Sequence, residues 1–211
     1  MGTLASGRKA DILFLLDCTR SMRGEIDAIR DAIMSFADTI KSDGVRARIG
    51  LIEFRDRFIG EEARVLRFGP GQDVFTADVV AFRQGVGALQ AKGGGDAPES
   101  SLDAVMLALR QPFAADASKV LVLITDAPPH IPDRETSSVD DVVNALREQG
   151  IQQCYLVMRT RDAASQAYLK LLEAAPGLAF DLGVGDDFRA RAENFKRTLM
   201  SLGKTISSST R

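Results

Sequence analysis

The sequence predicts an α/β protein with a mostly parallel central sheet and helices on both faces. Apolar runs alternate with amphipathic segments along nearly the whole chain, which is the pattern of such a sheet. The run at 11–17 is continuously apolar between two acids, as in a strand that is buried on both faces. One pair of strand-like segments, 45–54 and 63–68, follows in succession without a helix between them.

Six segments are predicted as strands because they are short, rich in aliphatic residues and bounded by turn-forming or acidic residues. The segment at 63–68 alternates its side chains, which is typical of an edge strand. The run at 120–124 is the most apolar after the first, and it too is followed by an acid, Asp126. The predicted strands are 11–17, 45–54, 63–68, 120–124, 151–158 and 178–182.

Apolar residues that recur at steps of three and four predict helices between these strands. In the first helix, Ile26 to Ile40 form one apolar face, and Ser21 precedes it where an N-cap is expected. The segment at 76–89 is a weaker helix because Gly85 and Gly87 interrupt it. The predicted helices lie near 26–40, 76–89, 102–109, 139–146, 167–172 and 188–206.

We expect one domain at 11–206, since 211 residues suit a single α/β domain. An N-terminal extension at 1–10 precedes it. The tail at 207–211, Ser-Ser-Ser-Thr-Arg, has nothing to bury and is predicted to be disordered.

Composition and charge narrow the function classes. The net charge of -2 gives no reason to expect a nucleic-acid partner, because phosphate binding usually needs a basic excess or a basic face. Cys18 and Cys154 both lie in apolar stretches, which indicates reduced core thiols and not a disulfide framework. The first apolar run is far too short for a signal or a membrane span. We therefore expect a cytoplasmic protein.

Acids and hydroxyls follow the predicted strands where ligands usually bind. In open α/β sheets this is the carboxyl edge, near the point where strand order reverses. Asp17, Thr19 and Ser21 leave the first strand, Asp126 leaves the strand at 120–124, and a glycine loop between them carries Glu99. Hard cations such as Mg²⁺ take oxygen ligands, and without one these carboxylates would repel each other. The sequence therefore predicts a divalent metal site, although Ser21 as a simple helix cap remains the alternative.

These segments resemble the metal-ion-dependent adhesion site of von Willebrand factor A-type domains. The stretch at 17–21, Asp-Cys-Thr-Arg-Ser, resembles the family's Asp-x-Ser/Thr-x-Ser signature, and Thr-Asp at 125–126 resembles its third segment. The loop at 94–99 resembles one used by integrin β-type and some microbial and alpha-kinase-linked A domains. The resemblance implies a three-layer Rossmann-like fold, mostly parallel with one short antiparallel edge strand.

The resemblance also implies a role for each residue. Thr19 and Ser21 would bind the metal through their hydroxyls, Glu99 directly in some states, and Asp17 and Asp126 directly or through water. A protein partner would complete the coordination with an Asp or Glu side chain. The implied cation is Mg²⁺, or Mn²⁺ or Ca²⁺ in its place.

The sequence departs from the family pattern in two places. Thr19 replaces the commoner serine but keeps the hydroxyl. Gly24 and Glu25 stand where integrin β-type domains have the acids of a second metal site, which puts that site in doubt. The resemblance instead points to Asp96 and the Pro98 carbonyl as ligands of a flanking ion.

Two further residues are candidate partner contacts, Arg20 within the signature and His130 beside two prolines. The chain has no other histidine, so a serine hydrolase would need His130, and no Gly-x-Ser-x-Gly elbow is present. Cys18 with Arg23 invites a cysteine-phosphatase interpretation, but four residues separate them where that family has five. We therefore expect a binding module and not an enzyme, with a metal-free interaction scaffold as the main alternative and a hydrolase or phosphatase as a lesser one.

Overall fold

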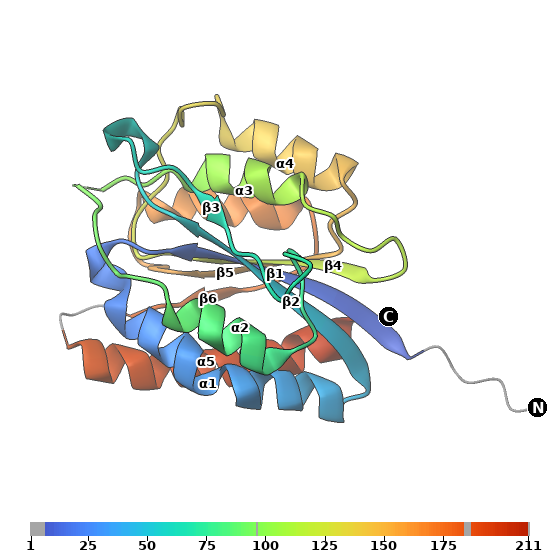
Figure 1. The fold of residues 1–211 in the computed structure, drawn as a ribbon. Helices are drawn as coiled ribbons and strands as arrows, with labels where there is room; N and C mark the ends of the chain where they lie inside the picture. The colour runs from blue at the N-terminus through green and yellow to red at the C-terminus, as the bar shows by residue number, and fades with distance from the viewer. Residues whose placement is uncertain (1–6, 96, 184–186, 211) are drawn as a thin grey trace, which may run out of the picture.

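A six-stranded sheet with the order β3-β2-β1-β4-β5-β6 forms the centre of the protein (Figure 1). The computed structural model describes residues 7–95, 97–183 and 187–210. All neighbouring strands are parallel except β2 and β3, which are antiparallel at one edge. The strands are β1 (Arg8–Asp17), β2 (Val45–Phe54), β3 (Arg64–Val65), β4 (Ser118–Ile124), β5 (Gln153–Met158) and β6 (Ala179–Asp181). The predicted fold class, including the edge strand, is confirmed.

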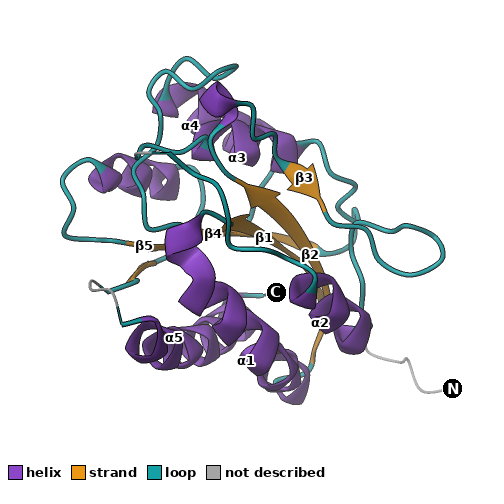
Figure 2. Cartoon of the chain, turned by 60° about the vertical axis from the view of Figure 1, so that its left-hand side comes forward, coloured by secondary structure: helices purple, strands orange, loops and turns teal. Residues whose placement is uncertain are grey.

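Helices cover both faces of the sheet. Helices α1, α2 and α5 lie on one face, and α3, α4 and the 3-10 helix η3 lie on the other (Figure 2). The α-helices are α1 (Arg23–Ser42), α2 (Val79–Gly87), α3 (Ser101–Leu109), α4 (Val139–Glu148) and α5 (Phe188–Ser209). The 3-10 helices are η1 (Arg20–Met22), η2 (Arg57–Ile59) and η3 (Ser165–Glu173).

Strand β1 explains where a ligand site belongs. It pairs with β2 on one side and β4 on the other. Strand β3 lies beyond β2, and β5 and β6 lie beyond β4, so the direction in which strands are added reverses at β1. The side chains of β1 alternate between the two faces, so Phe14 packs under α1 and α2 while Leu13 and Leu15 pack under α3. Parallel strands buried on both faces need this unbroken apolar sequence. The switch point between β1 and β4 therefore opens at Asp17 and Asp126.

Both cysteines lie in this core as free thiols, as the sequence predicted. Burial raises the pKa of Cys154 to about 12 and that of Cys18 still higher, so neither thiol ionises readily. Among the described residues, no helix is both long enough and apolar enough to cross a bilayer.

The C-terminal tail departs from the prediction. The disorder expected for residues 207–211 is wrong up to residue 210, because α5 continues to Ser209 and both Ser207 and Thr210 are buried. Their hydroxyls donate to carbonyl oxygens one turn earlier in the helix, so these polar side chains need no water. Residue 211 lies outside the described residues.

The N-terminal extension is also shorter than residues 1–10, because β1 begins at Arg8. The Arg8 guanidinium donates to the Ser207 carbonyl at 2.9 Å, which ties the start of the strand to the end of α5. This contact joins positions 199 residues apart, so local sequence patterns give no sign of it.

Candidate functional site

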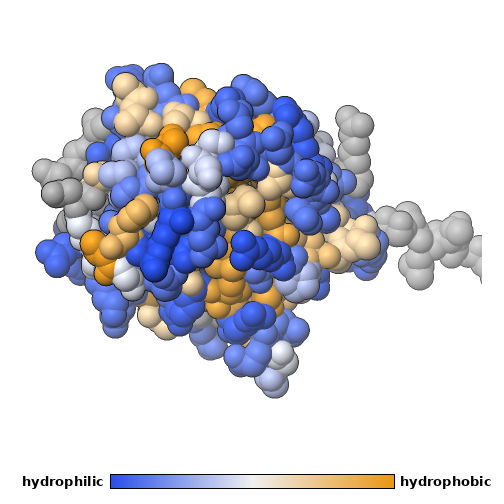
Figure 3. Space-filling model, turned by 90° about the horizontal axis from the view of Figure 1, so that it is seen from above, coloured by the Kyte–Doolittle hydropathy of each residue, from blue (hydrophilic) through white to orange (hydrophobic). Residues whose placement is uncertain are grey.

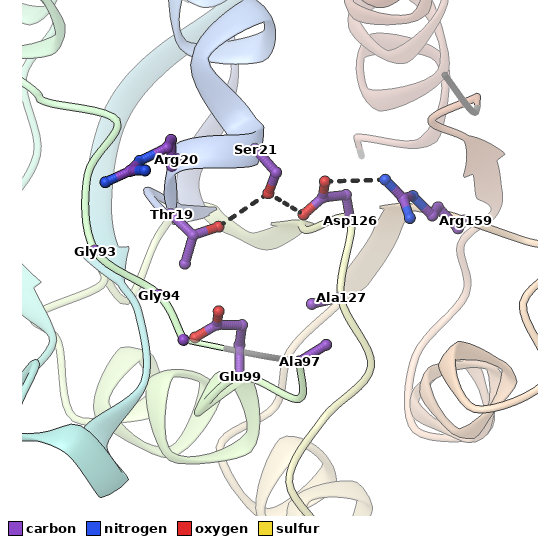
Figure 4. A pocket seen from close by; sticks show the side chains of 11 residues that line it. Thr19, Arg20, Ser21, Gly93, Gly94, Ala97, Glu99, Asp126, Ala127 and Arg159 are labelled. Carbon is purple, nitrogen blue, oxygen red and sulfur yellow. Dashed lines mark hydrogen bonds and ion pairs between the residues drawn. The ribbon is translucent and has the colours of Figure 1, made fainter. Parts of the chain in front are cut away.

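A pocket of about 540 Å³ opens at the carboxyl ends of β1 and β4 (Figure 4). Thr19, Ser21, Asp126 and Arg159, from the segments after β1, β4 and β5, lie along one side, and Ala97 and Glu99, which follow the glycine loop, lie along the other. It is lined by Thr19, Arg20, Ser21, Gly93, Gly94, Gly95, Ala97, Glu99, Asp126, Ala127 and Arg159.

Asp17 lies beneath the pocket and is fully buried. Its Oδ1 accepts hydrogen bonds from the Thr19 backbone N–H at 2.9 Å and the Thr19 hydroxyl at 2.6 Å. Its Oδ2 accepts a bond from the Thr125 hydroxyl at 2.7 Å. Burial raises the pKa of Asp17 to about 6, with repulsion from Asp126 adding to the rise and the Thr19 and Thr125 bonds opposing it. Asp17 therefore holds its neighbours in place through both oxygens.

Thr19, Ser21 and Asp126 continue this chain of contacts toward the pocket (Figure 4). The Ser21 hydroxyl donates to Asp126 Oδ1 at 2.9 Å, and the Thr19 and Ser21 hydroxyl oxygens lie 3.2 Å apart. Each hydroxyl has one proton, and where Thr19 and Ser21 give theirs to Asp17 and Asp126, no proton remains for the contact between the two hydroxyl oxygens. Both oxygens then keep lone pairs that could bind a cation.

Ser21 is thus not the helix N-cap that its position indicated. It lies inside η1, and the structure gives no side-chain capping bond at the start of η1 or α1. The hydroxyl reaches across to Asp126, 105 positions away.

Glu99 faces these residues from the other side of the gap (Figure 4). Its backbone is fixed, because its N–H donates to the Pro128 carbonyl and its carbonyl accepts from His130 N–H, both at 3.0 Å. The side chain is 3% exposed, and within the described part of the chain its buried Oε2 has no hydrogen-bond partner. The pKa of Glu99 is raised to about 8, mainly by burial and further by the nearby charges of Asp17, Asp56 and other acids.

Gly94 allows the glycine loop to approach the signature segment closely. Its φ is +69°, and a Cβ built on it would lie 2.7 Å from Thr19 Cγ2 and 3.0 Å from Glu99 Oε1. Its N–H donates to Glu61 Oε2 at 2.9 Å, which fixes the loop from the outside. Glycine is therefore required here both by conformation and by space.

Two arginines contact Asp126 on the side away from Ser21. Arg159 Nη2 lies 3.2 Å and Arg191 Nη2 3.5 Å from Asp126 Oδ2. Buried Arg191, from α5, also pairs with buried Glu25 at 2.8 Å. The Glu25 carboxylate, at a position compared above with the second metal site of integrin β-type domains, is thus engaged by an arginine.

The remaining predicted residues have different placements. Arg20 is exposed and lines the pocket, as a partner contact would require. His130 does not line it but contacts Asp56 Oδ1 through Nε2 at 3.1 Å. Pro98 follows Ala97 in a cis peptide bond and is half-buried, whereas Asp96 lies outside the described residues. The proposed flanking ion therefore stays a prediction.

Several functional neighbours were not predicted from the sequence. Arg55, at the end of β2, donates from Nε to the carbonyls of Cys18 and Lys92 at 3.1 and 2.9 Å. It also donates from Nη2 to the Gln90 carbonyl, so it ties the glycine loop to the end of β1. The sequence feature that could have predicted Arg55 is its position directly after a buried strand. Arg159 has the same position after β5, whereas no local sequence feature predicts a role for Arg191.

The donor set decides which cation would fit. Across residues 7–95, 97–183 and 187–210, no three acids, histidines or cysteines gather as a metal-binding group. A metal ion here would depend on the two hydroxyls together with Glu99 and Asp126. Such an all-oxygen set suits a hard cation such as Mg²⁺ that keeps several waters.

Comparisons with known proteins agree with the fold. A family model described as von Willebrand factor A domain matches residues 11–179. The alpha-protein kinase vwkA of Dictyostelium discoideum is 28% identical over 122 residues, which are 57% of this chain and 19% of the kinase. A solved von Willebrand factor type A structure from Catenulispora acidiphila is 20% identical with a TM-score of 0.61.

The structural match covers 93% of this chain and 43% of that one, so this chain spans less than half of either relative. The family generally provides protein-interaction modules. The family match covers most of the chain, and the chain belongs to the von Willebrand factor A domain family.

Proposed function

We propose that this domain binds a protein partner through a divalent cation held in the pocket. One observation carries the proposal: the hydroxyls of Thr19 and Ser21 donate to carboxylates, and their oxygens line a pocket that Glu99 faces from the opposite side. Glu99 has a buried oxygen that no hydrogen bond satisfies within the described residues. Unsatisfied buried oxygens are costly, and a cation would relieve that cost.

Thr19, Ser21, Glu99 and Asp126 would hold the cation, and Asp17 would orient Thr19 from below. When bound, a divalent cation supplies a Lewis-acidic position that attracts a carboxylate. Mg²⁺ usually keeps part of its coordination as water, which an incoming Asp or Glu can replace. The domain then binds its partner because its own residues leave the coordination incomplete. Mn²⁺ or Ca²⁺ would fill the same role.

The positions of the reactive residues favour binding over catalysis. The Cys18 side chain lies in the core, and burial raises its pKa, so it is a poor nucleophile. His130 does not line the pocket, where a hydrolase would need a base. The kinase activity in the name of the Dictyostelium relative belongs to a much longer protein, and we do not extend it to this chain. Two free buried thiols suit a reducing compartment, and we propose a cytoplasmic location.

A metal-free scaffold is the second candidate. The contacts of Asp126 with two arginines favour it, because they already offset the charge of that carboxylate. The two functions differ in one respect, since a scaffold gains no stability from a cation.

Thermal unfolding of EDTA-treated protein, with and without Mg²⁺, Mn²⁺ or Ca²⁺, separates them. At about a hundred times its Kd, a bound metal adds about 2.7 kcal/mol to the free energy of unfolding. We expect this gain in the wild type and in Ser201→Ala, an exposed serine of α5, but not in Ser21→Ala. No gain in the wild type at saturating metal, or an equal gain in Ser21→Ala, would overturn the metal site.

A further inference from the structure

The η2 turn beside the pocket is fixed firmly from below. The Asp56 side chain accepts from Phe58 N–H at 2.8 Å at its start, and Gly60 closes it with a left-handed backbone. The buried side of the turn is held by Arg57, which pairs with Asp103 at 2.6 Å and with Glu62 and Glu135 at 2.7 Å each. The turn therefore has a defined conformation, and its exposed side chains are held in place.

This fixed turn presents hydrophobic side chains to solvent. Phe58 is 54% exposed and Ile59 is 57% exposed, and Ile131 from the neighbouring loop is 52% exposed. The Phe58 ring packs on His130, with ring centroids 4.4 Å apart, which brings the two loops together. We call Phe58, Ile59 and Ile131 the η2 patch. Hydrophobic side chains also reach the surface on the face seen in Figure 3, amid a mostly hydrophilic surround.

Scattered exposed hydrophobic residues are common on soluble proteins, but grouped ones mark binding surfaces. The ion pairs of Arg57 fix the turn in a conformation that leaves Phe58 and Ile59 exposed, which favours a role in binding. An energetic anchor at an interface is typically an aromatic or large aliphatic side chain on a rigid support.

The η2 patch is continuous with the rim of the pocket. Ile59 Cδ1 lies 3.9 Å from the position of a Cβ on Gly95, which lines the pocket. His130, under Phe58, donates its backbone N–H to the Glu99 carbonyl at 3.0 Å. A segment whose side chain enters the pocket would therefore pass over or beside the patch.

The charge of the pocket rim decides which side chain enters. Arg20 is exposed at the rim, and Arg159 lines the pocket beside Asp126. Together with a bound cation, these guanidinium groups favour a carboxylate from outside. The pocket thus suits an acid, and the adjoining patch suits an apolar side chain.

We propose that the partner is a protein segment with an Asp or Glu close to a large apolar side chain. The acid enters the pocket and the apolar side chain packs on the η2 patch. This inference rests on the proposed metal-dependent function and adds to it the chemistry of the partner. The η2 patch then selects among the many acidic segments that a cation alone would accept.

Fluorescently labelled peptides on a Gly-Ser background test this directly. One peptide carries a single Asp, a second adds a Leu at varied positions on either side, and a third carries the Leu without the Asp. Fluorescence anisotropy with Mn²⁺ or with EDTA gives the Kd of each. The proteins are the wild type, the double variant Phe58→Ser/Ile59→Ser, and the control Val80→Ser, which changes an equally exposed residue of α2.

We expect the best-placed Leu to strengthen metal-dependent binding about tenfold, as burial of one aliphatic side chain should. The double variant should lose this gain yet keep the affinity for the Asp-only peptide and the metal-induced rise in Tm. The Val80→Ser variant should behave as the wild type.

Other outcomes separate the two proposals. Metal-dependent binding of the Asp peptides without any gain from Leu, or a gain that the double variant keeps, overturns the partner chemistry and leaves the proposed function standing. Binding of the Leu peptides that needs neither Asp nor metal overturns both. Failure of the wild type to bind any peptide at saturating metal also overturns both. Self-association that sedimentation detects in the wild type and not in the double variant assigns the patch to a second copy and overturns the proposed partner.

Discussion

Replacing Glu99 by glutamine tests whether the pocket contains a carboxyl that its own residues leave unsatisfied. In the folded protein the pKa of Glu99 rises from 4.5 to about 8, first because of burial and then because of neighbouring acids. The folded state therefore holds a proton that the unfolded chain releases. The contribution of protonated Glu99 to the free energy of unfolding is fully present below about pH 4.5, and it is lost as the pH rises toward about 8. Glutamine cannot ionise, so the variant should lack this loss.

The magnitude follows from the same shift. Neutral pH lies about two and a half units above the ordinary pKa, and each unit corresponds to about 1.4 kcal/mol. The upper limit at neutral pH is therefore about 3.5 kcal/mol. The pocket is open to water, which screens the charges, so we expect Glu99→Gln to stabilise the metal-free protein by about 1–2 kcal/mol. That corresponds to a Tm increase of roughly 2–8 °C for a domain of this size.

Differential scanning calorimetry of EDTA-treated protein is the suitable assay, since the chain contains no tryptophan for fluorescence. Scans at about pH 5 and about pH 8 should show a smaller decrease of Tm in Glu99→Gln than in the wild type. The exposed Glu148 of α4 provides the matched control, and Glu148→Gln should follow the wild type. Added Mg²⁺ should stabilise the wild type more than Glu99→Gln. A variant that is less stable than the wild type at neutral pH, with the same pH dependence, would refute the reasoning.

Three further variants examine how the pocket is built. Gly94→Ala places a Cβ against Thr19 and should lose the metal-induced rise in Tm. The control Gly60→Ala has a similar backbone conformation but open space around it, and it should keep that rise. Equal responses of the two variants would show that the close approach of Gly94 to Thr19 is unimportant. Arg55→Met removes the bonds to the glycine loop and should cost about 3 kcal/mol, with faster hydrogen exchange in that loop; unchanged exchange would contradict its positioning role. Tyr168→Phe removes the partner of the buried Ser101 hydroxyl and one of two donors to the Ala127 carbonyl, and it should cost about 1–3 kcal/mol in chemical denaturation without altering the metal response. A lost response would place Tyr168 among the residues that shape the pocket.

The sheet could be predicted because its determinants are local. Strands β1 and β4 are buried on both faces, so each appears as a continuous apolar run that ends near an acid. Strand β6 was predicted at 178–182 and is formed at Ala179–Asp181, since its ends depend on the neighbour with which it pairs. Helix α2 was predicted at 76–89 and is formed at Val79–Gly87, so it ends at the second of its glycines. Gly85 lies where a Cβ would be 2.9 Å from Phe68, so a glycine permits this close packing.

The candidate site was predictable only in part, because some of its contacts join residues that are far apart in the sequence. The side chains that follow β1 and β4 come together because parallel strands bring their carboxyl ends to one edge. Arg191 contacts Asp126 across 65 positions, so no spacing rule reveals it. Ser21 precedes a helix whether its hydroxyl caps that helix or reaches Asp126, and only the folded chain distinguishes the two.

The arginines around Asp126 account for the need for an outside acid in the proposed function. Asp126 Oδ2 is shared by Arg159 and Arg191, and Oδ1 accepts the Ser21 proton, so little of its negative charge is left for a cation. Asp17 is similarly engaged by three hydrogen bonds from Thr19 and Thr125. Glu99 is then the main carboxylate that a divalent ion could use, and one carboxylate leaves that ion with an excess of positive charge. A carboxylate from a partner would supply the missing charge. The incompleteness of the site is on this view the source of its affinity for acidic partners.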